Sequence, residues 1–377
     1  MFQQSGAAAW DAARQLAAQL ASGGESEPNV DPSDRIAVEQ LARVAELHVV
    51  GATGLEATSE ISILATTRTG WAAATLTAYR PLFERLADSL GEAPVGADHL
   101  DELDEADPAA AMFGTLMKML APMMLGMTAG SMVGHLAQRS LGSYDLPLPR
   151  PVGEPLLLVP ANVDDLADEW SLPPDDLRLW VCVHDVASHL VLHVPSLHTR
   201  LTDLLQQYVS SFQSDPSSLE ASLGDLDLGD PSSFERLQST LSDPDTVLGA
   251  IRSPVQDALL PELEALVAVI VGYVDHIVDQ VAGELITTAT MTGEALRRRR
   301  VTADPSDRFV ERLLGLELGQ DQYDRGQRFV AGVIERRGTE GLARLFESDA
   351  TIPTPAEVDA PGLWLARLDL PPDRPLD

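Results

Sequence analysis

Residues 171–195 read SLPPDDLRLWVCVHDVASHLVLHVP, and this stretch decides how the rest of the chain is interpreted. Prolines and acids at its start, followed by apolar residues, predict a helix that continues to about His193 and is stopped by Pro195. Four of the eight histidines of the chain fall in or just after this helix: His184, His189, His193 and His198.

The spacing of the first histidine is that of a metallopeptidase motif with one partner changed. In His-Glu-x-x-His, two imidazoles about 40° apart on a helix bind zinc, and the glutamate takes a proton from the zinc-bound water. The frame here is His184-Asp185-Val186-Ala187-Ser188. The first ligand is present, the general base is one methylene shorter, and the second ligand is a neutral hydroxyl, which is a poor zinc donor.

The neighbouring histidines do not restore the motif. His189 lies roughly 140° around the helix from His184. His189 and His193 are spaced correctly for each other, but Leu190 occupies the position of the base. We expect an accidental pair on a partly exposed face, with a relocated metal site as the alternative.

Composition limits the partners and the compartment. The chain has 58 acidic and 26 basic residues and a net charge of −32, so nucleic acids and anionic membranes are not expected partners. A single cysteine, Cys182, excludes an internal disulfide and a Cys-rich zinc site and suits a reducing cytosol. The N-terminal MFQQSGAAAWDAARQL lacks the pattern of a signal peptide, so we expect a cytoplasmic protein.

Periodicity and punctuation predict a mostly α fold with a minor extended element at Leu156–Val159. We expect an N-terminal helical region over 1–91, an acidic linker over 92–108 and a core over 109–377, with a flexible acidic insertion at 214–247. The predicted helices cover residues 7–21, 31–50, 70–91, 171–193, 196–213, 261–284, 304–314, 320–337 and 338–347, with a short one around Trp364.

The stretch 109–137 contains seven of the nine methionines, and Gly126, Gly130 and Gly134 give one helix face a flat strip. We interpret it as a buried helix or helical hairpin that packs closely through its glycines. A membrane anchor is the weaker hypothesis, because Lys118 and Pro122 interrupt the apolar run.

Phrases in a shared order along nearly the whole chain resemble the actinobacterial zincin-like metallopeptidase family, type 2. They include WDAARQLAAQL, DPSDRIAVEQLARVAEL, DDLRLWVCVHDVASH, the Gly/Met-rich run, ALRRRR, QYDRGQRFVAGVIERRG and IPTPAEVDAPGLWLARL. The resemblance implies a zincin-like, mostly helical fold and a zinc-dependent peptidase activity.

The family pattern implies that His184 stands at the first ligand position, Asp185 at the general base and Ser188 at the second ligand. The third ligand would be a glutamate where this chain has Val271, in the phrase VGYVDH (271–276). With two of three ligand positions changed, we expect no zinc, no catalysis, and a binding or scaffolding role toward a protein or peptide partner.

Two alternatives stay open. An active zinc metallopeptidase could use a rewired site, with Asp185 as the base and with His184 joined by an acid or by one of the substitute ligands His276, His189 and His193. The run Arg297–Arg300 is expected to form a solvated, salt-bridged turn, or else a docking patch for a partner.

Overall fold

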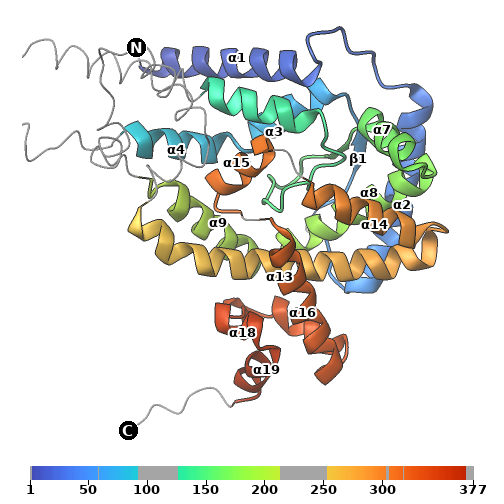
Figure 1. The fold of residues 1–377 in the computed structure, drawn as a ribbon, viewed down its shortest axis with the longest axis vertical. Coiled ribbons are helices and arrows are strands. Elements are labelled where there is room, and N and C mark those ends of the chain that lie inside the picture. The colour runs from blue at the N-terminus through green and yellow to red at the C-terminus, as the bar shows by residue number, and fades with distance from the viewer. Residues whose placement is uncertain are drawn as a thin grey trace, which may run out of the picture.

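The computed structural model describes residues 2–57, 59–91, 126–212, 253–302, 305–316 and 318–370, and these are mostly helical, as predicted. The predicted linker at 92–108 and the predicted insertion at 214–247 lie outside the described residues. Figure 1 shows the long helix α13 (Pro254–Leu285) crossing the molecule, with α1 (Phe2–Ala21) and α3 (Arg68–Ala78) on one side and α16 (Gln320–Arg337) and α19 (Pro361–Asp369) on the other.

The N-terminal helices follow their sequence signals, with one difference. Helix α2 (Pro32–Thr53) begins at Asp31, whose carboxylate accepts the Ser33 N–H at 2.8 Å. The helix predicted over 70–91 is two helices, α3 and α4 (Arg80–Gly91), which meet at Tyr79. Pro81 explains the break, because proline lacks an N–H and clashes with the preceding turn.

The extended element predicted at 156–159 is β2 (Leu156–Leu158). It pairs in parallel with β1 (Ile63–Ala65), so that Ile63 lies opposite Leu156 in a two-stranded sheet. Helix α7 (Pro160–Trp170) follows directly, and then α8 (Pro174–Leu192) and α9 (Pro195–Val209).

Helix α13 begins seven residues before the predicted start at Pro261. Ser253 and Gln256 form a reciprocal cap, in which each side chain accepts the backbone N–H of the other residue, at 3.3 and 2.9 Å. Pro261 therefore lies inside the helix, where sequence rules place a start. The helix is apolar nearly all round and buried along most of its length.

The C-terminal helices pack on α13 through a close glycine contact. A Cβ atom at Gly326, on the helix Gln320–Arg337, would lie 2.0 Å from the backbone oxygen of Ala268 on α13. The elements in this part are α14 (Ala289–Val301), α15 (Pro305–Leu313), α16 (Gln320–Arg337), α17 (Glu340–Ala343), the 3₁₀ turns Arg344–Phe346 and Asp349–Thr351, α18 (Pro355–Asp359) and α19 (Pro361–Asp369).

Residues 126–137 are helical, and their glycine strip packs against α1 as the sequence predicts. Cβ atoms built at Gly126, Gly130 and Gly134 would lie 2.8, 2.4 and 3.0 Å from backbone oxygens of α1. The first part of the Met/Gly-rich run, 109–125, lies outside the described residues. Among the helices that the structure describes, none has the length and apolar character needed to span a membrane.

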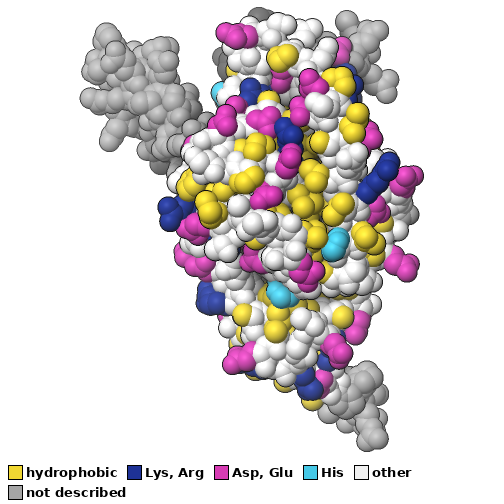
Figure 2. All heavy atoms as spheres, turned by 90° about the vertical axis from the view of Figure 1, so that its right-hand side faces the viewer, with side chains coloured by type: hydrophobic (Ala, Val, Ile, Leu, Met, Phe, Trp, Pro, Cys, Tyr) yellow, Lys and Arg dark blue, Asp and Glu magenta, His cyan; other side chains and the backbone are white. Residues whose placement is uncertain are grey.

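A continuous hydrophobic cluster joins the N-terminal helices to the rest of the described chain. It extends from Trp10 on α1 through α8 and α13 to Leu365 on α19. On the face drawn in Figure 2, acidic side chains are spread widely and surround an area richer in hydrophobic side chains. Helix α2, at the right of Figure 1, carries exposed apolar side chains at Ile36, Val44 and Leu47.

Candidate functional site

A cavity of about 110 Å³ lies between α8, α13, α14 and the segment 136–147. On α8, the lining side chains apart from Val181 recur every four residues, so they share one face of the helix. The facing wall comes from α13, one helical turn of which lines the cavity. The residues in question are Trp180, His184, Ser188 and Leu192 on α8, and Ile270, Val271, Val274 and Asp275 on α13.

The structure brings three of the sequence-selected positions to this cavity. His184 and Ser188 lie one turn apart on α8, and Val271 lies across from them on α13. The His184 imidazole stacks on Trp180, with 5.2 Å between ring centroids and 10° between planes. An imidazole, a hydroxyl and an isopropyl group therefore meet where the family resemblance implies two imidazoles and a carboxylate.

Asp185 does not line the cavity. Its side chain is only 1% exposed. Its two oxygens accept the backbone N–H groups of Ser143 at 2.6 Å and Tyr144 at 3.2 Å. Oδ1 also lies 3.5 Å from Nδ1 of His184. The residue at the general-base position thus holds a loop of the cavity wall.

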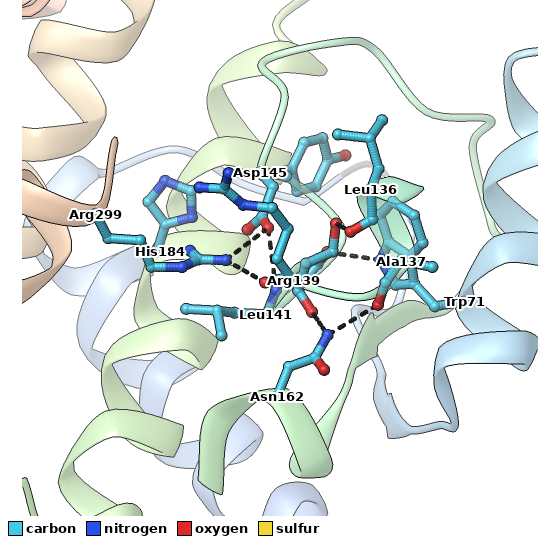
Figure 3. Close-up of polar contacts among 12 residues, drawn as sticks. Trp71, Leu136, Ala137, Arg139, Leu141, Asp145, Asn162, His184 and Arg299 are labelled. Carbon is cyan, nitrogen blue, oxygen red and sulfur yellow. Dashed lines mark hydrogen bonds and ion pairs between the residues drawn. The ribbon is translucent and has the colours of Figure 1, made fainter. Parts of the chain in front are cut away.

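This loop is fixed on several sides, as Figure 3 shows for part of it. Trp71 Nε1 donates to the Gly142 carbonyl at 2.7 Å, and Asn162 Nδ2 donates to the carbonyls of Ala137 and Ser140 at 2.9 and 2.7 Å. Such bonds pair the buried backbone groups of an irregular segment, so the wall that faces His184 is preformed.

The histidines beyond the motif are buried, which corrects the expectation of a partly exposed pair. His189 Nδ1 lies 3.0 Å from the Tyr144 hydroxyl, and the ring nitrogens of His193 lie 2.8 and 3.1 Å from the carbonyl oxygens of His189 and Arg150. Burial, with a smaller contribution from His193, lowers the pKa of His189 to about 4. Neither ring lines the cavity, so both serve to pack the far side of the loop.

The arginine run is part of a helix, so the predicted turn is wrong, whereas Arg297 and Arg298 are solvated and salt-bridged as predicted. Arg297–Arg300 end α14, and Arg299 and Arg300 turn to the cavity. Nη1 of Arg300 donates to both carboxylate oxygens of Asp275, at 2.8 and 2.9 Å. Burial alone would lower the pKa of Arg300, but Asp275 raises it, and the guanidinium stays charged.

His276 lies beside this pair in sequence but not at the cavity wall. Burial lowers its pKa, opposed by the nearby Asp279 carboxylate. The structure therefore places His184 apart from each of the histidines that we named as substitute ligands: His189, His193 and His276.

Sequence reasoning missed the charged groups that line the cavity. Figure 3 shows Arg139 and Arg299 near His184, and Arg299 hydrogen-bonds the Arg139 carbonyl and lies 3.8 Å from Asp145. One signal was available. Asp275 sits in an apolar helix, and a buried carboxylate requires a donor or a cation.

Comparisons with known proteins find a matching family and a similar fold. Residues 9–365 match the sequence profile of the zincin-like metallopeptidases. The chain belongs to this family. Its fold is similar to the crystal structure of a Chloroflexus aurantiacus protein described as a candidate hydrolase with a novel fold, with a TM-score of 0.67 and 22% identity over 96% of this chain and 99% of that one. No curated protein matches the sequence.

A catalytic zinc in a zincin-like metallopeptidase would need about three protein ligands and a water. At this cavity His184 supplies one imidazole, and three carboxylates also line the wall: Asp145, Asp275 and Glu311. Asp275 is bound to Arg300, and Asp145 accepts the Leu141 N–H and lies 3.8 Å from Arg299. Across the described part of the chain, no group of three or more His, Cys, Asp or Glu side chains is placed to hold a metal ion. The donors that the described residues place at this cavity do not fit a catalytic zinc.

Proposed function

We propose that this chain is a catalytically silent zincin-like metallopeptidase whose cavity binds a ligand without zinc. The observation that carries the proposal is the convergence of His184, Ser188 and Val271 on one cavity. A hydroxyl and an isopropyl group leave one imidazole among the three ligand positions that the family resemblance implies, and a catalytic zinc needs about three protein ligands.

The environment of Asp185 supports the same conclusion. A general base must reach the proton of a bound water within about 2.6–3.2 Å. Asp185 instead has both oxygens occupied by the amides of Ser143 and Tyr144. Freeing the carboxylate would leave two buried N–H groups without a partner, which costs about 1–3 kcal/mol for each group.

The alternative of a rewired, active site gains no support from the geometry. His189 and His193 bond to Tyr144 and to backbone carbonyls, and His276 does not line the cavity. A binding or scaffolding role for the preformed cavity, toward a protein or peptide, is the function that remains.

Metal analysis of the full chain tests the proposal. The protein is purified without chelator and without a histidine tag, and its zinc content is measured by mass spectrometry. We expect a zinc content far below stoichiometric, and no cleavage of a peptide library with or without a chelator. Near-stoichiometric zinc, or cleavage that a chelator abolishes, would overturn the proposal.

A restored variant serves as the positive control for that measurement. Ser188→His together with Val271→Glu places an imidazole one turn after His184 and a carboxylate across the cavity. We expect this double variant to retain zinc where the parent protein does not. Ser188→Ala with Val271→Ala is the matched control, because it changes the same positions without adding ligands.

A further inference from the structure

We propose that the cavity binds the carboxylate of a small apolar acid, anchored by Arg300. This inference rests on the proposed function, because it assigns a ligand to the same metal-free cavity. The cavity wall combines apolar side chains with several cationic ones. Most of the lining side chains are apolar, yet arginines from two different segments reach the same space: Arg139, Arg299 and Arg300.

Asp275 holds the Arg300 guanidinium in place but leaves some of its N–H groups without an acceptor. Asp275 binds only Nη1, and Nε and Nη2 of Arg300 make no hydrogen bond with any described residue. The side chain keeps 19% of its surface exposed. Its guanidinium carbon lies 5.0 Å from the Tyr323 ring centre and 5.9 Å from that of Trp180, which fixes the plane.

The unused edge has the right shape for a carboxylate. Nε and Nη2 present two parallel N–H groups, the geometry that pairs with the two oxygens of a carboxylate. Since Asp275 already orients the guanidinium, little side-chain entropy would be lost when a ligand binds. This pre-organisation distinguishes Arg300 from an exposed arginine.

Further donors line the same cavity. The Ser188 hydroxyl and the Tyr323 hydroxyl line the cavity and have no hydrogen-bond partner within the described part of the chain. Burial raises the pKa of Tyr323 to about 12, so its hydroxyl is protonated and can donate at neutral pH. Oxygen atoms of a ligand would therefore meet donors from α8, α14 and α16.

The charge balance favours a monoanion over phosphate. The three arginines of the wall face three acids, Asp145, Asp275 and Glu311, so the formal charges cancel. A doubly charged phosphate would be poorly compensated there, and the net charge of −32 would add to its repulsion. A single carboxylate bound to Nε and Nη2 of Arg300 carries one negative charge, so less positive charge is needed to balance it.

The size and the walls define the rest of the ligand. The enclosed volume of about 110 Å³ is smaller than the roughly 150 Å³ cavity that accepts benzene, so it holds a short branched alkyl group at most. The cavity is partly open, so the rest of a longer ligand can extend out of it. Leu192, Ile270, Val274 and Leu296 offer it apolar contacts. Such an acid could be a free branched-chain acid or the C-terminal residue of a peptide.

Titration of the full chain, shown free of metal by analysis and kept with chelator, tests the inference. The probes are 4-methylpentanoate for a free acid and N-acetylleucine for a peptide end, with their neutral amides and inorganic phosphate as comparisons. Binding is followed by calorimetry and by tryptophan fluorescence. We expect both acids to bind at least about tenfold more tightly than their amides, which corresponds to about 1.4 kcal/mol.

The outcomes divide clearly. Tighter binding of N-acetylleucine than of 4-methylpentanoate assigns the peptide source, and the reverse order assigns the free acid. Amides that bind as well as acids, phosphate that binds more tightly than either acid, or no binding at millimolar concentrations would each overturn the inference. If the metal-free chain binds no acid, the proposed function still stands. If the chain carries zinc, the proposed function is wrong, whatever the binding of acids.

Variants locate the site. Arg300→Gln combined with Asp275→Asn removes the fork without leaving a buried carboxylate unpaired, and we expect at least about a tenfold loss of acid binding with no change for the amides. The control is Arg298→Gln, on the same helix, where the side chain is 64% exposed. Ser188→Ala leaves the ion pair intact and should weaken acid binding severalfold. If the double variant fails to fold, two other results decide. The assignment is contradicted if Ser188→Ala binds the acids as tightly as the parent protein does and the parent protein binds acids and amides equally.

Discussion

The carboxylate of Asp185 on α8 accepts the backbone N–H of Ser143 at 2.6 Å, across 42 residues of sequence. A Cβ atom at the neighbouring Gly142 would lie 2.5 Å from the same carboxylate, so the helix and the loop approach as closely as their atoms allow. The side chain at the position that the family resemblance assigns to a general base therefore has a structural role, which requires an acid.

Asp185→Asn should destabilise the protein by about 2–3 kcal/mol, because hydrogen bonds to a charged acceptor are worth about that much each and one amide oxygen replaces two carboxylate oxygens. Urea denaturation measures the change, and hydrogen exchange at the Ser143 and Tyr144 amides reports on the loop. Asp175→Asn, on the same helix with its side chain 82% exposed, is the control and should have little effect. Equal stability of the two variants would contradict the structural role.

Much of the fold could be predicted from the sequence because its signals are local. Prolines, caps and apolar periodicity place the helices, and the glycine strip of 126–137 predicts the close packing that α1 provides. The errors also have local causes. Periodicity alone predicts one helix over 70–91, but Pro81 divides it into two. The cap at Ser253 starts a helix seven residues before the predicted start at Pro261.

The candidate site was only half predictable. The four-residue spacing puts His184 and Ser188 on one helix face, and no tertiary information is needed for that. The partners of that face come from elements distant in sequence, such as Arg299 on α14 and Arg139 before the loop. The contact between them is made through a backbone carbonyl, which carries no signature in the sequence. The arginine run therefore looked like a solvated surface.

The glycine contact between α13 and α16 makes a second prediction. Gly326→Ala would place a methyl group 2.0 Å from the Ala268 oxygen and 3.1 Å from the Cα atom of Gly272, so the helices must separate. We expect a loss of about 1–3 kcal/mol or more from overpacking. Gly283→Ala, also on α13 but with nothing within 4 Å of its Cβ, should instead stabilise by up to about 1 kcal/mol. A similar effect of both substitutions would refute the close approach.

The Arg300–Asp275 pair predicts a non-additive result. Removing either partner alone leaves a largely buried charge, so Arg300→Gln and Asp275→Asn should each cost about 3–5 kcal/mol. The double variant should be less destabilised than the sum, because neither charge then lacks a partner. A double-mutant cycle by chemical denaturation measures the coupling free energy. Purely additive effects would show that the pair is not coupled.

The buried His189 predicts how stability depends on pH. Burial lowers its pKa from an ordinary 6.5 to about 4, so the native state holds it neutral while the unfolded chain takes up a proton. The contribution to stability is therefore complete above pH 6.5 and is lost as the pH falls toward 4, with a total of about 3 kcal/mol. His193 and His276, whose pKa values are also lowered by burial, add to the same trend.

His189→Gln should flatten the dependence of stability on pH between pH 4 and 6.5. His135→Gln, which replaces an exposed histidine, should leave the slope unchanged. Denaturation midpoints measured from pH 4 to 7.5 decide the question, and an unaltered slope in His189→Gln would mean that this ring is not held neutral in the folded protein.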